Sequence, residues 1–518
     1  MKYFFLFALF ILNAFPVFSQ KEVLSVLDYA STMEKQTIMA QPMDTTVKLE
    51  YFLFLTKRCN PEYTADVKKW FSDIILELKK KKIEKKSNKQ KIAMIQKMVN
   101  KKCLLKYSYY AEFHEIYEAG VFNCVTGSVL FALIFDEFHI PYEVLYSPIH
   151  VYLMAYPSTE KFVVEATAKS DEVMVYSKTF KEEYIQMLAD RKTISVAQRA
   201  KYSVDELFSK HYLNETRINL WKLIGVHYLN YGIQLSSSDD YLKIFSAAYK
   251  ASLFNQDEKT EYLLMNYLER IDDKIPTSAY SAILLSVRKQ YSYNPLIGEI
   301  AHHYYYNRLY HMYEEGKADS LIQKTVLEAK EVIADSALLN DVLFNERLWA
   351  FDYADEWEIE ERFDIAKQAF KFNPEHTKLK KQLGLLFFSQ ISNYESPEDM
   401  QTALNEFVNE FPQMKDNESI KMASILAELA IVDELYGKRK IKEANSRFLE
   451  LEPKLHEIKI EETLLEFAVA NVYGDFVSWN VREGNLKLAA AILDKGIELL
   501  PDSYDFRTRR KSLRDKGF

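Results

Sequence analysis

The chain has 518 residues, of which 48% are hydrophobic and 27% are charged, so it has the composition of a globular protein and is too long for a single core. Its formal net charge of -8 gives no overall basic character for binding nucleic acid or an anionic membrane. Only 12 glycines and 13 prolines are present, which indicates long helices and few hairpins.

The start of the chain has the pattern of an export signal. One lysine precedes an apolar run from residue 3 to about residue 18, which is short for a membrane-spanning helix. Val17 and Ser19 are small enough for the −3 and −1 positions of a cleavage site after residue 19. We therefore expect a signal peptide at residues 1–19 and an exported protein, either periplasmic or secreted. An uncleaved N-terminal anchor is the alternative.

Residues from about 20 to 105 show the spacing of helices. Trp70, Ile74 and Leu78 recur at intervals of one helical turn. A run rich in lysine follows between residues 79 and 91. Because no aromatic residues alternate with these lysines, we interpret the run as a solvated helix face or loop rather than a contact with nucleic acid or a membrane.

Cysteine occurs three times, at Cys59, Cys103 and Cys124. In an exported protein an odd number of cysteines leaves one thiol over. Two arrangements fit the sequence equally well. Either Cys59 and Cys103 form a disulfide and Cys124 is free, or all three are reduced, buried thiols.

The next region, residues 106–170, mixes helix and strand patterns. CVTGSVLFALIFDEF, which starts at Cys124, is apolar on nearly all sides and predicts a buried helix. PYEVLY, HVYLMAY and KFVVEAT are rich in β-branched and aromatic residues and predict three short strands within residues 141–167. In the second strand, His150 and Tyr152 should share one face.

These elements contain a nucleophile, a base and an acid. Asn123 is a favourable N-cap, so Cys124 should begin the helix, where the positive end of the helix dipole favours a thiolate and free backbone N–H groups could bind an oxyanion. An antiparallel strand pair after the helix would return His150 to the helix start. Glu165 in the third strand could then orient His150. The sequence thus predicts a catalytic site of Cys124, His150 and Glu165. Taken singly, each residue is more commonly structural.

The order of these residues resembles the transglutaminase-like superfamily, which has a papain-like fold. The strings FNCVTGS, HVYL and VEAT are similar to those of bacterial transglutaminase-like domains attached to helical repeats. The resemblance covers roughly residues 105–170. It implies an amide hydrolase or acyl transferase in which Cys124 is the nucleophile, His150 the base and Glu165 the orienting acid. The family usually has aspartate at the third position, so the longer Glu165 side chain must be set back.

An oxyanion-binding side chain cannot be assigned from the sequence. Tyr109, Tyr110 and Glu112 are candidates because they are polar and lie upstream of Cys124. No cofactor or metal is expected, since no phosphate-binding glycine loop or zinc-binding spacing is present.

From about residue 215 to the end, the pattern is helical. The stretch GDFVSWNVREGNLKLAAAILDKGIELLPDS places Gly484 in a helix–helix turn, Ala489 and Gly496 in the next helix, and Pro501 at that helix's end. FDIAKQAFKFNPEHTKLKKQLGLLFFSQ, from residue 363, has a similar order. These stretches resemble degenerate tetratricopeptide repeats, in which small residues let paired helices approach closely. A generic α-solenoid is the alternative.

We therefore expect an α+β N-terminal transglutaminase-like (papain-like) domain at residues 20–214, after the signal peptide, and an all-α helical-repeat (tetratricopeptide-like α-solenoid) domain at residues 215–518. The expected function is thiol-dependent amide hydrolysis or acyl transfer, with a protein or peptide partner bound by the repeats. The alternative is a catalytically silent fold that acts with the repeats as a protein-binding scaffold. No nucleic-acid partner and no membrane span after signal removal are expected.

Overall fold

The computed structural model describes residues 20–40, 48–147, 150–167, 178–190, 194–211, 216–458, 460 and 463–518. The predicted signal peptide, residues 1–19, lies outside the described residues. The chain divides into two compact units, Met1–Ile300 and Ala301–Phe518, and the division falls inside helix α15 (Pro295–Glu314). The predicted domain boundary at residues 214 and 215 lies within the first unit and stays a prediction.

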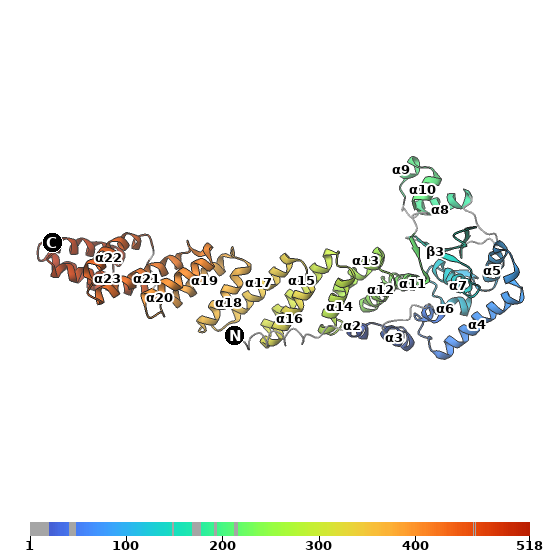
Figure 1. Cartoon of the computed structure of the whole chain (residues 1–518), viewed down its shortest axis with the longest axis horizontal. Coiled ribbons are helices and arrows are strands. Elements are labelled where there is room, and N and C mark those ends of the chain that lie inside the picture. The colour runs from blue at the N-terminus through green and yellow to red at the C-terminus, as the bar shows by residue number, and fades with distance from the viewer. Residues whose placement is uncertain are drawn as a thin grey trace. The chain divides into compact units, whose positions relative to one another are not determined.

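Helices make up most of the first unit, from the blue to the green part of Figure 1. Its helices and 3-10 turns are α2 (Gln20–Val26), α3 (Thr32–Met39), η1 (Leu49–Leu53), α4 (Pro61–Lys80), η2 (Ile83–Lys85), α5 (Asn88–Lys102), α6 (His114–Ala119), α7 (Cys124–Glu137), α8 (Lys178–Asp190), α9 (Val196–Lys201), α10 (Val204–His211), α11 (Leu220–Leu235), α12 (Tyr241–Phe254), α13 (Glu258–Leu268), η3 (Glu269–Ile271) and α14 (Thr277–Gln290).

Two small sheets lie among these helices. Strands β1 (Lys106–Tyr107) and β2 (Val121–Phe122) pair in parallel. The larger sheet has the order β5-β4-β3-β6, with every neighbouring pair antiparallel. Its strands are β3 (Tyr142–Ser147), β4 (His150–Ala155), β5 (Phe162–Val164) and β6 (Thr216–Ile218).

The larger sheet is covered on both faces by helices. Helix α7 packs against β4, and its residues from Val125 to Phe135 are all buried, which confirms the predicted buried helix. Tyr152 and Leu145 join an apolar cluster with residues of α8 and α10. The sheet is therefore a thin layer between helices.

The predicted α+β papain-like fold is wrong. The strands expected within residues 141–167 are present, but of the described residues 72% are helical and only 5% are in strands. No strand of the larger sheet exceeds six residues. The strand pattern is local. Helices form most of the described chain between residues 20 and 211, because their apolar faces follow the helical period.

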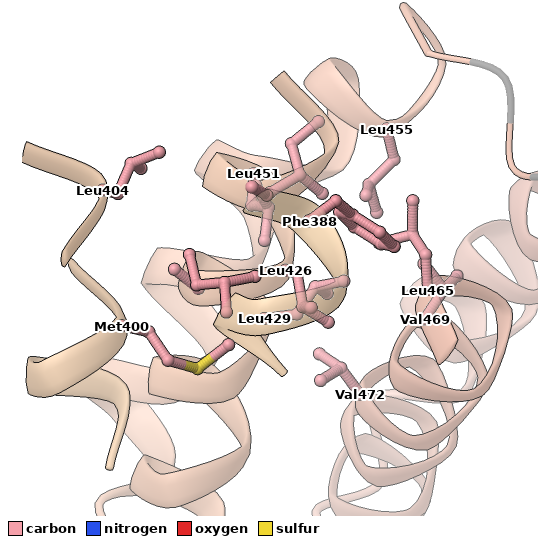
Figure 2. Close-up of a cluster of buried hydrophobic side chains, with 14 of the residues drawn as sticks. Phe388, Met400, Leu404, Leu426, Leu429, Leu451, Leu455, Leu465, Val469 and Val472 are labelled. Atoms are coloured by element: carbon pink, nitrogen blue, oxygen red, sulfur yellow. The ribbon is translucent and has the colours of Figure 1, made fainter. Parts of the chain in front are cut away.

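Helices alone form the described part of the second unit. After α15 these are α16 (Asp319–Val332), α17 (Ser336–Tyr353), α18 (Ile359–Phe372), α19 (Thr377–Ile391), α20 (Pro397–Glu410), η4 (Pro412–Met414), α21 (Glu418–Gly437), α22 (Ile441–Leu455), α23 (Thr463–Arg482), α24 (Leu486–Leu499) and α25 (Tyr504–Arg514). Figure 2 shows Phe388 of α19 and Leu426 of α21 in one apolar cluster with Leu451 of α22 and Val472 of α23.

Glycines mark two of the predicted features of this unit. Gly484 has a φ of 80° in the turn between α23 and α24, as expected for a helix–helix turn. At Gly496 an added Cβ would lie 2.9 Å from the Tyr473 ring and 3.0 Å from that of Phe506, so the absence of a side chain lets α24 approach both neighbours. Whether these helices are tetratricopeptide repeats stays a prediction. Within the described ranges, no helix has the length and apolar character needed to cross a membrane.

Candidate active site

Helix α7 begins at Cys124, as the sequence predicts, because Asn123 caps it. The Asn123 Oδ1 accepts from the Thr126 backbone N–H at 2.9 Å, and the Thr126 Oγ1 accepts from the Asn123 N–H at 2.9 Å. The Asn123 Nδ2 also donates to the backbone oxygens of Ala111, at 2.9 Å, and Tyr109, at 3.2 Å. This reciprocal capping fixes the first turn of the helix and holds the half-buried Cys124 at its first position.

The sheet brings Glu165 to His150. Leu153 of β4 pairs with Val164 of β5 in an antiparallel register. Glu165 is the residue after β5, so it lies opposite Tyr152. It therefore shares a face of the sheet with Tyr152 and His150 and lies diagonal to His150. The His150 Nε2 lies 2.6 Å from the Glu165 Oε2. The His150 side chain is 17% exposed, whereas that of Glu165 is 3% exposed. The longer side chain of glutamate therefore reaches the histidine from a position after the end of the strand.

Thr167 fixes the second oxygen of this carboxylate. Its Oγ1 donates to the Glu165 Oε1 at 2.8 Å, and its backbone N–H donates to the same oxygen at 3.3 Å. The sequence analysis did not single out Thr167. Its position two residues after Glu165, where a hydroxyl can bond back to a nearby carboxylate, was the available indication.

The first turns of α7 are pressed closely against the sheet. A Cβ added at Gly127 would lie 2.5 Å from the Cβ of Ala166, the residue after Glu165. The Ser128 Oγ donates to the Val151 oxygen at 3.3 Å, next to His150. Both contacts depend on small residues in α7, so the spacing between the helix start and the two strand ends is set by Gly127 and Ser128.

Cys124 and His150 are joined by a side-chain hydrogen bond. Burial by itself would lower the pKa of His150, but the Glu165 carboxylate and the bond with Cys124 raise it to about 10. The imidazole is therefore protonated on both ring nitrogens, and positively charged, at neutral pH. The structure thus brings all three predicted site residues together.

The other two cysteines lie in different surroundings. All three cysteines are free thiols, so the structure contains no Cys59–Cys103 disulfide. Burial raises the pKa of Cys103 to about 12 and also raises the pKa of Cys59. Both are buried, whereas Cys124 is partly open to solvent. Only Cys124 combines access with a histidine partner.

The upstream polar residues Tyr109, Tyr110 and Glu112 stay candidates for an oxyanion-binding side chain. The Tyr109 and Tyr110 side chains are 59% and 55% exposed, and Glu112 pairs with His114, whose Nδ1 lies 3.2 Å from the Glu112 Oε2. The Thr126 N–H is bonded to Asn123. Helix geometry leaves the backbone N–H groups of Cys124 and Val125 without intrahelical partners, so they are further candidates.

Among the described residues, no group of three or more histidine, cysteine, aspartate or glutamate side chains is arranged to hold a metal ion. The sequence matches no family model, and none of the curated proteins matches it. The resemblance to transglutaminase-like domains therefore depends on the local residues of this chain alone.

Proposed function

We propose that the first unit is a thiol-dependent amide hydrolase or acyl transferase, with Cys124 as nucleophile, His150 as proton carrier and Glu165 as the residue that positions His150. One observation carries the proposal: a half-buried thiol at the first position of a helix shares a histidine with a buried carboxylate. A nucleophile, an acid–base group and an orienting group in one hydrogen-bonded series is the arrangement that activates a thiol.

In the proposed reaction, the Cys124 thiol gives its proton to His150, the sulfur attacks the carbonyl carbon of an amide, and the carbonyl electrons move to oxygen as the C–S bond forms. Backbone N–H groups of the first turn of α7 donate to this oxyanion. His150 gives its proton to the amine nitrogen as the C–N bond breaks, which leaves a thioester. Water or a second amine then attacks the thioester, His150 accepts its proton, and the C–S bond breaks. Attack by water completes hydrolysis, and attack by an amine completes acyl transfer.

The proposal extends to partners and location. A polypeptide substrate or partner bound by the helices of the second unit, and no nucleic acid, fits the expected class of helical repeats. Export is inferred from residues 1–19 alone. The resemblance to transglutaminase-like domains supports an amide substrate, although the papain-like fold itself is not part of the proposal.

The test is the rate at which iodoacetamide alkylates Cys124, followed by mass spectrometry over a range of pH. The thiolate is the form that reacts, so the rate reports how far the surroundings of Cys124 favour attack. His150→Ala should slow it by about 100-fold, in line with the loss of an acid–base partner. Cys59 and Cys103 serve as internal references because both are buried.

His311→Ala is the matched control, since the His311 side chain is 65% exposed on α15 and distant in sequence from the site. It should leave the labelling rate unchanged. Equal pH profiles for the wild type and His150→Ala would identify Cys124 as a structural thiol. That result would contradict catalysis and favour the alternative, a protein-binding scaffold.

A further inference from the structure

Hydrogen bonds alone leave the His150 ring free to tilt. Its side-chain partners lie on two elements, with Cys124 at the start of α7 and Glu165 after β5. The last torsion of a histidine side chain has broad minima, so the rotamer does not fix the plane of the ring. Proton exchange between a thiol and an imidazole depends on the alignment of the two groups. A contact with the face of the ring would preserve that alignment.

Tyr152 makes a contact of this kind. It lies two residues after His150 on β4, so the two side chains share one face of the strand. Their ring centroids are 6.1 Å apart and the ring planes are 23° from parallel, which is within the range of stacked aromatic pairs. A flat ring in this position opposes rotation of the imidazole out of its plane.

The Tyr152 ring is itself held in place. It is 1% exposed, and in the sheet it lies opposite Leu145 of β3. Both residues belong to the apolar cluster that contains Leu188 of α8 and Phe208 of α10. A ring enclosed by close-packed neighbours has little freedom to move. Tyr152 therefore forms a fixed surface against which the imidazole rests.

Burial is also the ordinary property of a tyrosine in a protein core, so burial alone assigns no role to Tyr152. Leu188 is 1% exposed in the same cluster and provides the comparison. The difference between them is that Tyr152 stacks on a residue of the candidate site. The stack, rather than the burial, is the observation that points to the reaction.

We propose that Tyr152 is a positioning residue for the thiol-dependent reaction, and that its ring holds the His150 imidazole in the plane from which it exchanges a proton with Cys124. The inference rests on the proposed function, because Tyr152 acts through His150. Tyr152 neither attacks the substrate nor carries the proton.

The test is the rate at which iodoacetamide alkylates Cys124 in variants of the full-length chain, followed by mass spectrometry. Tyr152→Leu removes the ring but keeps an apolar side chain, so labelling should slow by about 10-fold. Tyr152→Phe keeps the ring and removes the hydroxyl, so its rate should lie within about two-fold of the wild-type rate. Equal slowing in Tyr152→Leu and Tyr152→Phe would assign the effect to the hydroxyl and overturn the proposal.

The His150→Ala background shows whether Tyr152 acts through His150. Once the imidazole is absent, Tyr152→Leu should cause no further slowing, because the two changes remove the same interaction. Equal slowing by Tyr152→Leu in the wild-type and His150→Ala backgrounds would mean that the tyrosine affects Cys124 by another route. That result would also overturn the proposal.

Leu188→Ala is the matched control, since Leu188 is as deeply buried in the same cluster but lies on α8. It should lower stability, as core truncations do, without changing the rate at Cys124. Slowing as large as that of Tyr152→Leu would assign the effect to the cluster and overturn a particular role for Tyr152. Cys59 and Cys103 are buried, so rates are compared under conditions in which neither is labelled.

A measurement on the wild type keeps the proposal testable if Tyr152→Leu does not fold. With labelled histidine and tyrosine in the full-length chain, NMR should detect magnetisation transfer between the ring protons of His150 and Tyr152. Tyr152→Phe identifies the tyrosine signal. Absence of this transfer in the folded protein would overturn the stack and the proposal with it.

The outcomes separate this proposal from the proposed function. Unchanged labelling in Tyr152→Leu, while His150→Ala still slows the reaction, would overturn the positioning role and leave the proposed function standing. Labelling that does not depend on His150 would overturn both, because Tyr152 would then have no catalytic group to position.

Discussion

Two clusters of charged side chains lie within the first unit, and they differ in access to solvent. In one, the Lys250 Nζ lies 2.7 Å from the Glu34 Oε1, and the two side chains are 4% and 0% exposed. In the other, Glu165 is equally buried, but His150 is 17% exposed and Cys124 is half-buried. The first cluster is sealed, whereas the second leaves a nucleophile within reach of a substrate.

The sealed cluster is saturated with partners. Tyr228 donates to the Glu34 Oε1 at 2.8 Å, and the Ala30 backbone N–H donates to its Oε2 at 2.7 Å. Lys250 donates to the Asp28 oxygen at 2.8 Å. These bonds join the N-terminal helices to α11 and α12. The comparison shows that burial and charge alone do not indicate a functional site, because a reaction also needs an atom that solvent or substrate can reach.

The largest expected effect lies in the sealed cluster. Glu34→Ala leaves the Lys250 ammonium buried without its counter-charge, which should lower the free energy of unfolding by about 3–5 kcal/mol. Chemical denaturation followed by circular dichroism measures this change. The rate of Cys124 alkylation in the folded fraction should stay the same, because the two clusters have no shared residue.

Gln36→Ala is the control for this prediction, since Gln36 is exposed on the same helix, α3. It should change stability by less than about 0.5 kcal/mol. A Glu34→Ala protein as stable as the control would mean that solvent reaches Lys250, and the contrast between a sealed and an open cluster would then be wrong.

A smaller effect is expected at the carboxylate of the candidate site. Glu165→Gln keeps the size of the side chain but removes the charge that faces His150, so alkylation of Cys124 should slow by about 10-fold or more. Unfolding free energy should fall by about 1.5–3 kcal/mol, the usual range for a hydrogen bond to a charged group. Iodoacetamide kinetics and denaturation midpoints measure the two effects.

The pH dependence of the stability of Glu165→Gln tests whether His150 is charged in the folded protein. The pKa of His150 is raised in the folded protein to about 10, from about 6.5 in the unfolded chain, so its contribution to stability is fully present below about pH 6.5 and is lost as pH rises through about 10. The difference in stability between wild type and Glu165→Gln should therefore shrink toward high pH. A difference that grows with pH would contradict this assignment.

The smallest effect is expected at Thr167. Thr167→Val removes the hydroxyl that bonds the Glu165 Oε1, at nearly constant volume, and should cost about 1 kcal/mol of stability. Alkylation should slow only a few-fold, because the His150 contact remains. A loss as large as that of Glu165→Gln would show that Thr167, rather than the charge itself, sets the position of His150.

The sequence determined the local parts of the site. Capping by Asn123, the helix that starts at Cys124 and the strand that starts at His150 follow from residue types within a few positions of one another. These interactions form within one segment and change little with their surroundings. The order of Cys124, His150 and Glu165 along the chain is also visible in the sequence itself.

Tertiary structure alone decided the rest. The three strands within residues 141–167 are predictable, but the α+β papain-like fold is not found because helices from other segments fill the space around the small sheet. Glu34 and Lys250 are 216 residues apart in the sequence, and His227 and Asn123 meet through the packing of α11 near the start of α7. Their burial and partners depend on which distant surfaces come together. The sequence therefore specified the reactive groups, and long-range packing determined which of them solvent can reach.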